Sequence, residues 1–187
     1  MSRIIVISGK QGSGKSTLAQ KVQDMFGGNA KVYKFADVLY EIHDYIRDKM
    51  RSLGIERPEK DGPLLQLLGT EWGRNTVDQN LWPNILLNRL KQDTSAAVLI
   101  DDCRFENEFD IIKNTYGDDA IMIRLECPEA VRKARCPAWR PNTEHPSETG
   151  LDRYSFEGKF DIVYFTNEKS PEQCANDLQK QIIKRWP

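Results

Sequence analysis

The chain has 187 residues, of which 39% are hydrophobic and 29% are charged, and its formal net charge is −1. This length suits one folded domain with a sizeable core, and the composition excludes a disordered or membrane-embedded protein. The near-neutral charge argues against a broad basic surface that binds duplex nucleic acid. The four cysteines include no C-x-x-C pair, and the first apolar run, of about five residues, is too short for a signal sequence. We therefore expect a cytoplasmic protein with reduced thiols, no membrane partner and no zinc site.

Strand-like and helix-like segments alternate along the chain. Runs rich in apolar and β-branched residues predict strands at RIIVIS (3–8), AKVYKF (30–35), AAVLID (96–101), AIMIRLE (120–126) and FDIVYF (160–165). Apolar residues at helical spacing predict helices at about 15–25, 37–50, 63–74, 81–92, 106–115, 128–135 and 171–186. Asp37 is expected to cap the second of these helices. Polar segments with several proline or glycine residues predict loops at 51–63 and 137–150.

This alternation predicts the fold class. Parallel strands are joined by right-handed crossovers that usually contain a helix, so the pattern indicates an α/β sandwich with a five-stranded parallel sheet. In such sheets, ligands bind at the carboxyl ends of the strands. The polar motifs described next follow predicted strands, which agrees with a site at that edge.

The segment GKQGSGKST comes directly after the first predicted strand and matches the pattern G-x-x-x-x-G-K-[ST]. Its glycines allow backbone N–H groups to converge on a phosphate, and Lys15 can bridge the β- and γ-phosphates. The Ser16 hydroxyl can bind Mg²⁺. We therefore expect ATP and Mg²⁺ as ligands of this segment, which consists of Gly9, Lys10, Gln11, Gly12, Ser13, Gly14, Lys15, Ser16 and Thr17.

Carboxylates and arginines follow the other predicted strands. Asp101 and Asp102 end the run VLIDD, and one of them is expected to face the metal ion; the sequence does not decide which. Guanidinium groups pair with phosphates and stabilise the charge of phosphoryl transfer. Two separate groups of arginines suggest two phosphate-bearing ligands, and their members are Arg74, Arg104, Arg132, Arg135 and Arg140.

Five further segments together resemble the phage-type deoxynucleoside monophosphate kinases: KFADVLYEI, LLQLLGTEWGR, LW, VLIDDCRFENE and HPSE. The resemblance runs in order from the glycine-rich loop to about Asn167. It implies a P-loop NTPase fold of the nucleoside monophosphate kinase type, a three-layer sandwich formed by one domain over 1–187. In that domain, residues of about 36–93 would bind the acceptor and residues of about 128–152 would form a lid. The implied reaction transfers the ATP γ-phosphate to a deoxynucleoside monophosphate and yields a diphosphate for DNA precursor synthesis.

The resemblance also implies roles for individual residues. Catalysis would involve Lys15, Arg104, Arg132 and Arg135. Acceptor binding would involve Asp37, Trp72, Arg74, Arg104 and Arg140, although an aromatic residue at helical spacing such as Trp72 more often belongs to a core. Arg132 and Asn167 would contact ATP, although a turn asparagine is equally suited to a purely structural role. The roles of His145, Ser147 and Glu148 remain open.

Other functions are compatible with the same motifs. The first is another small-molecule P-loop kinase, such as one that acts on dephospho-coenzyme A, and the second is a nucleotide-binding module without turnover. A nucleic-acid 5′-kinase would require a basic groove, which the net charge does not favour. The expected partners are therefore small nucleotides, without stable nucleic-acid binding, and the resemblance allows a homodimer. The sequence does not indicate which base or sugar is accepted.

Overall fold

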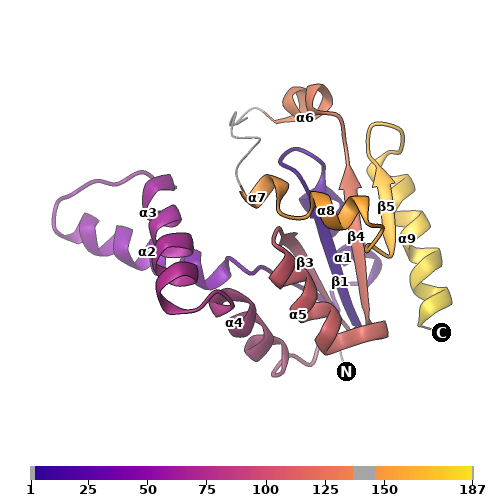
Figure 1. Ribbon diagram of the computed structural model, residues 1–187, viewed down its shortest axis with the longest axis horizontal. Helices are drawn as coiled ribbons and strands as arrows, with labels where there is room; N and C mark the ends of the chain where they lie inside the picture. The colour runs from indigo at the N-terminus through magenta and orange to yellow at the C-terminus, as the bar shows by residue number, and fades with distance from the viewer. Residues whose placement is uncertain (1–2, 137–145, 187) are drawn as a thin grey trace. The chain divides into compact units, whose positions relative to one another are not determined.

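The computed structural model describes residues 3–136 and 146–186 and contains a five-stranded sheet (Figure 1). All its paired strands are parallel, in the order β2-β3-β1-β4-β5. The predicted α/β fold with a five-stranded parallel sheet is therefore confirmed. The strands are β1 (Arg3–Gly9), β2 (Ala30–Tyr33), β3 (Ala97–Cys103), β4 (Ala120–Glu126) and β5 (Ile162–Phe165).

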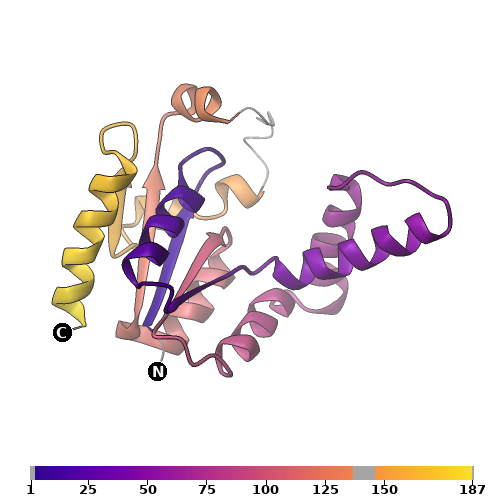
Figure 2. The ribbon, with the colours of Figure 1, turned by 180° about the vertical axis from the view of Figure 1, so that it is seen from behind.

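The chain divides into two compact units, Met1–Tyr33 with Asp93–Pro187, and Lys34–Gln92. The first unit contains the sheet, with α1 and α9 on one face and α5 and α8 on the other (Figures 1 and 2). Side chains of α1 and α9 such as Leu18 and Leu178 pack with the sheet residues Ile5 and Ile123 in one buried cluster. The helices of this unit are α1 (Lys15–Met25), α5 (Glu106–Tyr116), η2 (Gly117–Asp119), α6 (Glu129–Arg135), α7 (Pro146–Thr149), α8 (Asp152–Phe156) and α9 (Pro171–Arg185).

The second unit is helical and has its own buried side chains. Its elements are α2 (Asp37–Ser52), α3 (Gly62–Gln66), the π-helix η1 (Leu67–Val77) and α4 (Leu81–Leu90). Trp82 of α4 is 3% exposed, and its Nε1–H donates to the carbonyl oxygen of Gly69 at 2.9 Å. The indole therefore fastens α4 to η1, because a buried indole N–H requires a partner.

The helix expected at 63–74 is present, but it begins as α3 and continues as the π-helix η1, in which the Asp78 N–H donates to the Gly73 carbonyl, five residues earlier. Two local predictions were wrong. Asp37 does not precede α2 as its cap; it is the first residue of that helix, and its Oδ2 accepts the N–H of Lys34. The loop expected at 137–150 contains α7 at its end, while its residues 137–145 lie outside the described part of the chain.

Helix α8 was not predicted, because only one of its five side chains, Tyr154, is buried and so leaves no apolar period. Within residues 3–136 and 146–186, no helix combines the length and apolar character that crossing a membrane requires.

Candidate functional site

The glycine-rich segment forms the turn from the carboxyl end of β1 to the first residue of α1. Gly14 is the N-cap of α1 and has a left-handed backbone with φ of 95°. Gly12 has φ of 76°, and a Cβ added there would lie 2.7 Å from the carbonyl oxygen of Arg132. Both positions therefore require glycine, because a side chain would be strained at either and would clash at Gly12. The turn ends at the N-terminus of α1, where unpaired N–H groups and the helix dipole favour an anion.

Lys15 lies across this turn. Its ammonium group donates to the carbonyl oxygens of Gly9 at 2.7 Å and Lys10 at 2.9 Å. Burial and the Arg104 guanidinium lower the pKa of Lys15 from 10.5 to about 8, while the carboxylates of Glu148 and Asp101 act in the opposite direction. Lys15 is therefore a cation in a poorly solvated position, where a phosphate would interact with it strongly.

The second residue of α1 meets the end of β3. Ser16 Oγ donates to Asp101 Oδ2 at 3.0 Å, and Asp101 is only 4% exposed. Of the two adjacent carboxylates, Asp101 is thus the one that contacts the glycine-rich turn, while Asp102 is partly exposed beside it. A hydroxyl and a carboxylate are the oxygen ligands that Mg²⁺ prefers, so the chemistry of this pair fits a magnesium site.

Arg104 follows β3 and is bound to the segment around α7. Its Nη1 donates to Glu148 Oε1 at 2.6 Å and to the carbonyl oxygen of Ser147 at 3.2 Å. The other carboxylate oxygen of Glu148 accepts the backbone N–H of Gln11 at 2.7 Å. Glu148 therefore links a backbone donor of the glycine-rich turn to the arginine beside it.

Arg132 contacts the turn from α6, and Arg135 of the same helix contacts Thr166. Arg132 is 5% exposed and donates to the carbonyl oxygens of Cys127 and Gln11, each at 3.0 Å. Arg135 is exposed, and its Nη2 donates to the carbonyl oxygen of Thr166 at 2.8 Å. Thr166 lies after β5, next to Asn167. Arg132 therefore holds the backbone of the turn in place, while Arg135 lies beside Thr166, whose Oγ1 donates to the Ser13 carbonyl oxygen of the turn at 3.1 Å.

No protein-family model matches the chain. In complex with shikimate, shikimate kinase from Acinetobacter baumannii superposes with a TM-score of 0.57 at 16% identity, over 100% of this chain and 96% of that one. The fold is that of the P-loop kinases.

Two curated relatives are also kinases. Deoxynucleoside-5′-monophosphate kinase of Escherichia phage T5 is 32% identical over 88 residues, which are 47% of this chain and 33% of that protein. The chain therefore spans about a third of the phage protein's length. Phosphomevalonate kinase of Drosophila melanogaster is 21% identical over 190 residues and covers 97% of both chains.

Within the P-loop kinase fold, a second set of charged residues supports the glycine-rich turn. Arg124 of β4 is 3% exposed, and its guanidinium donates to Ser8 Oγ at 3.2 Å and to Asp152 Oδ1 at 2.8 Å. Asp152 also accepts from Lys10 Nζ at 2.7 Å. Sequence reasoning missed this network, although a charged residue within the buried run AIMIRLE is a visible signal. Asp152 has no such signal, because it lies 142 positions after Lys10.

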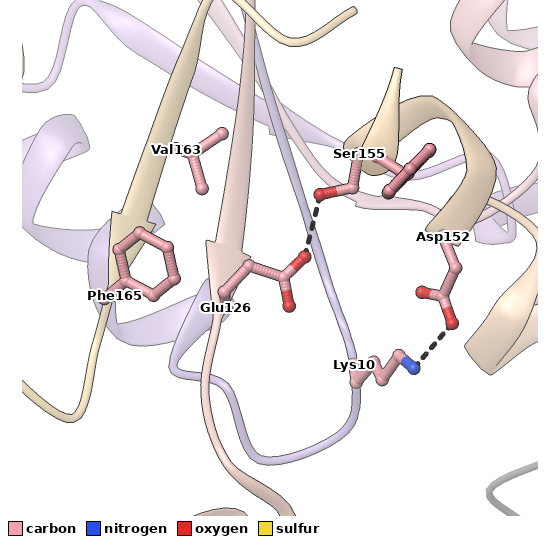
Figure 3. Close-up of a pocket in the computed structure, with 7 residues that line it drawn as sticks. Lys10, Glu126, Asp152, Ser155, Val163 and Phe165 are labelled. Carbon is pink, nitrogen blue, oxygen red and sulfur yellow. Dashed lines mark hydrogen bonds and ion pairs between the residues drawn. The ribbon is translucent and has the colours of Figure 1, made fainter. Parts of the chain in front are cut away.

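An open pocket of about 490 Å³ lies beside this network (Figure 3). Lys10 and Asp152 form part of its wall, and Ser155 donates to Glu126 on the other side at 2.9 Å. Exposed apolar side chains complete it, including Phe165, which is 53% exposed. Lys10 pairs with Asp152 in the pocket, and Glu126 pairs with Arg124 of the neighbouring network at 2.8 Å, so these charged groups serve the network that supports the turn.

The remaining expected site residues belong to the second unit or fall outside the described residues. Asp37, Trp72 and Arg74 belong to the second unit, where Trp72 is 44% exposed and Arg74 is partly buried in η1. Arg140 and His145 lie outside the described residues. The structure therefore brings together the glycine-rich turn with Asp101, Arg104, Arg132 and Arg135 in the first unit.

Proposed function

We propose that this protein transfers the γ-phosphate of ATP to a deoxynucleoside monophosphate, giving ADP and a deoxynucleoside diphosphate. The observation that carries the proposal is the grouping of the glycine-rich turn, Lys15, the Ser16–Asp101 pair and Arg104 at one edge of the sheet. The turn and Lys15 suit the triphosphate, whereas Arg104 supplies a guanidinium for a second phosphate.

The chain's residues would act mainly by position and charge. The backbone N–H groups of the turn and the ammonium group of Lys15 would hold the β- and γ-phosphates. Arg104 would hold the acceptor's phosphate, whose oxygen is already an anion and requires no strong base. Catalysis would then consist of aligning two phosphates that repel each other.

Ser16 and Asp101 would hold Mg²⁺, directly or through its water ligands. The ion would neutralise charge on the transferred phosphoryl group when bound. Arg132 would keep the turn in shape through the Gln11 carbonyl, and Arg135 would lie with Asn167 near the rest of the nucleotide.

Fewer residues of the chain support the proposed acceptor than support ATP as the phosphate donor. The deoxynucleotide acceptor is supported by the ordered motifs GTEWGR and DDCRFENE and by the partial likeness to the phage kinase. The likeness to phosphomevalonate kinase covers nearly all of both chains, at lower identity. It favours phosphomevalonate as the second candidate, and both acceptors carry a phosphate that an arginine can bind.

Initial rates of ADP production with separate acceptors test the proposal. The panel contains the four deoxynucleoside monophosphates, the four ribonucleotides, phosphomevalonate and dephospho-coenzyme A. Turnover is expected with at least one deoxynucleoside monophosphate, and Lys15→Ala should reduce it about 100-fold or more. If phosphomevalonate alone were phosphorylated, it would take the place of the deoxynucleoside monophosphate as the proposed acceptor. Absence of turnover with every acceptor would favour a nucleotide-binding module without catalysis.

A further inference from the structure

Glu148 is bound by groups of the kind that bind phosphate. Its two carboxylate oxygens accept from the Gln11 backbone N–H at 2.7 Å and from Arg104 Nη1 at 2.6 Å. Its side chain is only 12% exposed. Loop N–H groups and guanidinium groups are the usual donors to phosphate oxygens, so an acidic side chain lies where a phosphoryl group would find its partners.

The surrounding backbone determines this position. Leu151 is 1% exposed and anchors the end of the segment that carries Glu148. At Gly150, an added Cβ would lie 2.7 Å from the carbonyl oxygens of both Arg104 and Pro146, so the chain passes directly against the end of β3. The backbone that carries Glu148 is therefore held in place by packing. A change of the Glu148 side-chain rotamer would be enough to move its carboxylate away from Gln11 and Arg104.

The charge of Glu148 matters to the same site. Its carboxylate forms an ion pair with the Arg104 guanidinium at 2.6 Å. The carboxylate therefore offsets part of the positive charge that Arg104 presents beside the turn. An incoming triphosphate carries the same sign of charge and requires the same donors, so both anions cannot occupy them at once.

We propose that Glu148 is an internal competitor for the phosphate cradle, and that phosphate binding turns its carboxylate away and releases Arg104. The inference rests on the proposed function, because the released guanidinium is the one assigned to the acceptor's phosphate. Triphosphate binding would then favour acceptor binding, and by reciprocity the acceptor would favour the triphosphate.

Calorimetric titration with inorganic tripolyphosphate, without added metal, tests the competition. Glu148→Gln keeps the size of the side chain but removes its charge, so tripolyphosphate should bind about tenfold more tightly than to the unaltered protein. Glu157→Gln is the matched control. That carboxylate lies after α8 and pairs with Arg153 and Lys159 at 3.5 Å and 3.3 Å, so its loss should leave the affinity unchanged.

A second variant covers the case in which Glu148→Gln does not fold, as judged by circular dichroism. Glu148→Asp keeps the charge but shortens the side chain, so it cannot bridge Gln11 and Arg104, and it should also bind more tightly than the unaltered protein. Two results together would overturn the role of Glu148 but leave the proposed function standing. The folded Glu148 variants would bind tripolyphosphate no more tightly than the unaltered protein, and Lys15→Ala would lose the binding that the unaltered protein shows. If neither the unaltered protein nor any Glu148 variant bound tripolyphosphate, the proposed function would fail together with it.

Discussion

At the scale of single residues, the protonation of Lys15 is open to direct test. Burial and Arg104 lower its pKa to about 8, whereas a nearby phosphate favours the ammonium form. Above this pH the unliganded protein loses the proton, so ADP binding should take up a proton and weaken as the pH rises. Calorimetry at about pH 8.5, where the phosphates of ADP are fully ionised, in buffers of different ionisation enthalpy measures that uptake.

Lys15→Arg is the control for this experiment, since a guanidinium remains charged throughout the range. Binding of ADP to Lys15→Arg should therefore take up no proton. Equal uptake by the variant and the unaltered protein would assign the proton to another group.

Arg104 permits a test of the division between donor and acceptor. Arg104→Ala should raise the acceptor KM by about 10- to 100-fold, because a charge-assisted hydrogen bond to phosphate is lost. The KM for ATP should change much less. Arg153→Ala removes an exposed arginine paired with Glu106 and should leave both constants unchanged. A change confined to the ATP KM would contradict the assignment.

At the scale of elements, the stability of the π-helix η1 should depend more on Gly73 than on Gly69. A Cβ at Gly73 would lie 2.7 Å from the Leu68 carbonyl oxygen and 2.7 Å from Trp82, whereas a Cβ at Gly69 would meet only Leu39 at 2.9 Å or more. The Leu39 methyl groups can rotate away, but the backbone and the indole cannot. Gly73→Ala should therefore lower the free energy of unfolding by about 1–3 kcal/mol.

Gly69→Ala should change it by less than about 1 kcal/mol, since alanine also favours a helix. Urea denaturation of the two variants measures the difference. Equal decreases in the free energy of unfolding would show that the contacts of Gly73 do not determine the stability of η1.

The elements differ in how well the sequence predicts them. The three central strands β1, β3 and β4 are apolar runs such as AIMIRLE that are almost fully buried, so their local pattern is enough to predict them. The π-helix is harder to predict, because its apolar spacing is that of an ordinary helix and the close approach of Gly73 to Trp82 is a contact between two elements. The glycine-rich turn has a sequence signature, whereas the contact of Glu148 with Gln11 joins residues 137 positions apart and has none.

At the scale of the whole molecule, each unit has its own buried residues, but the glycine-rich turn belongs to the first unit alone. The sheet residues Ile5 and Ile123 are fully buried there, whereas Trp82 and Leu86 are buried in the second unit. A ligand that binds only the folded turn should therefore stabilise the protein through the unit that contains the sheet.

Thermal unfolding with ADP measures this stabilisation. At a concentration of about 100 times its Kd, a ligand stabilises the folded state by about 2.7 kcal/mol. For a chain of this length the Tm should rise by about 5–10 °C. Lys15→Ala should fold with a similar Tm in the absence of ADP, because Lys15 bonds only to carbonyl oxygens of its own turn in the described part of the chain. Its Tm should hardly respond to the nucleotide, and an equal rise in the variant would mean that ADP binds away from the turn.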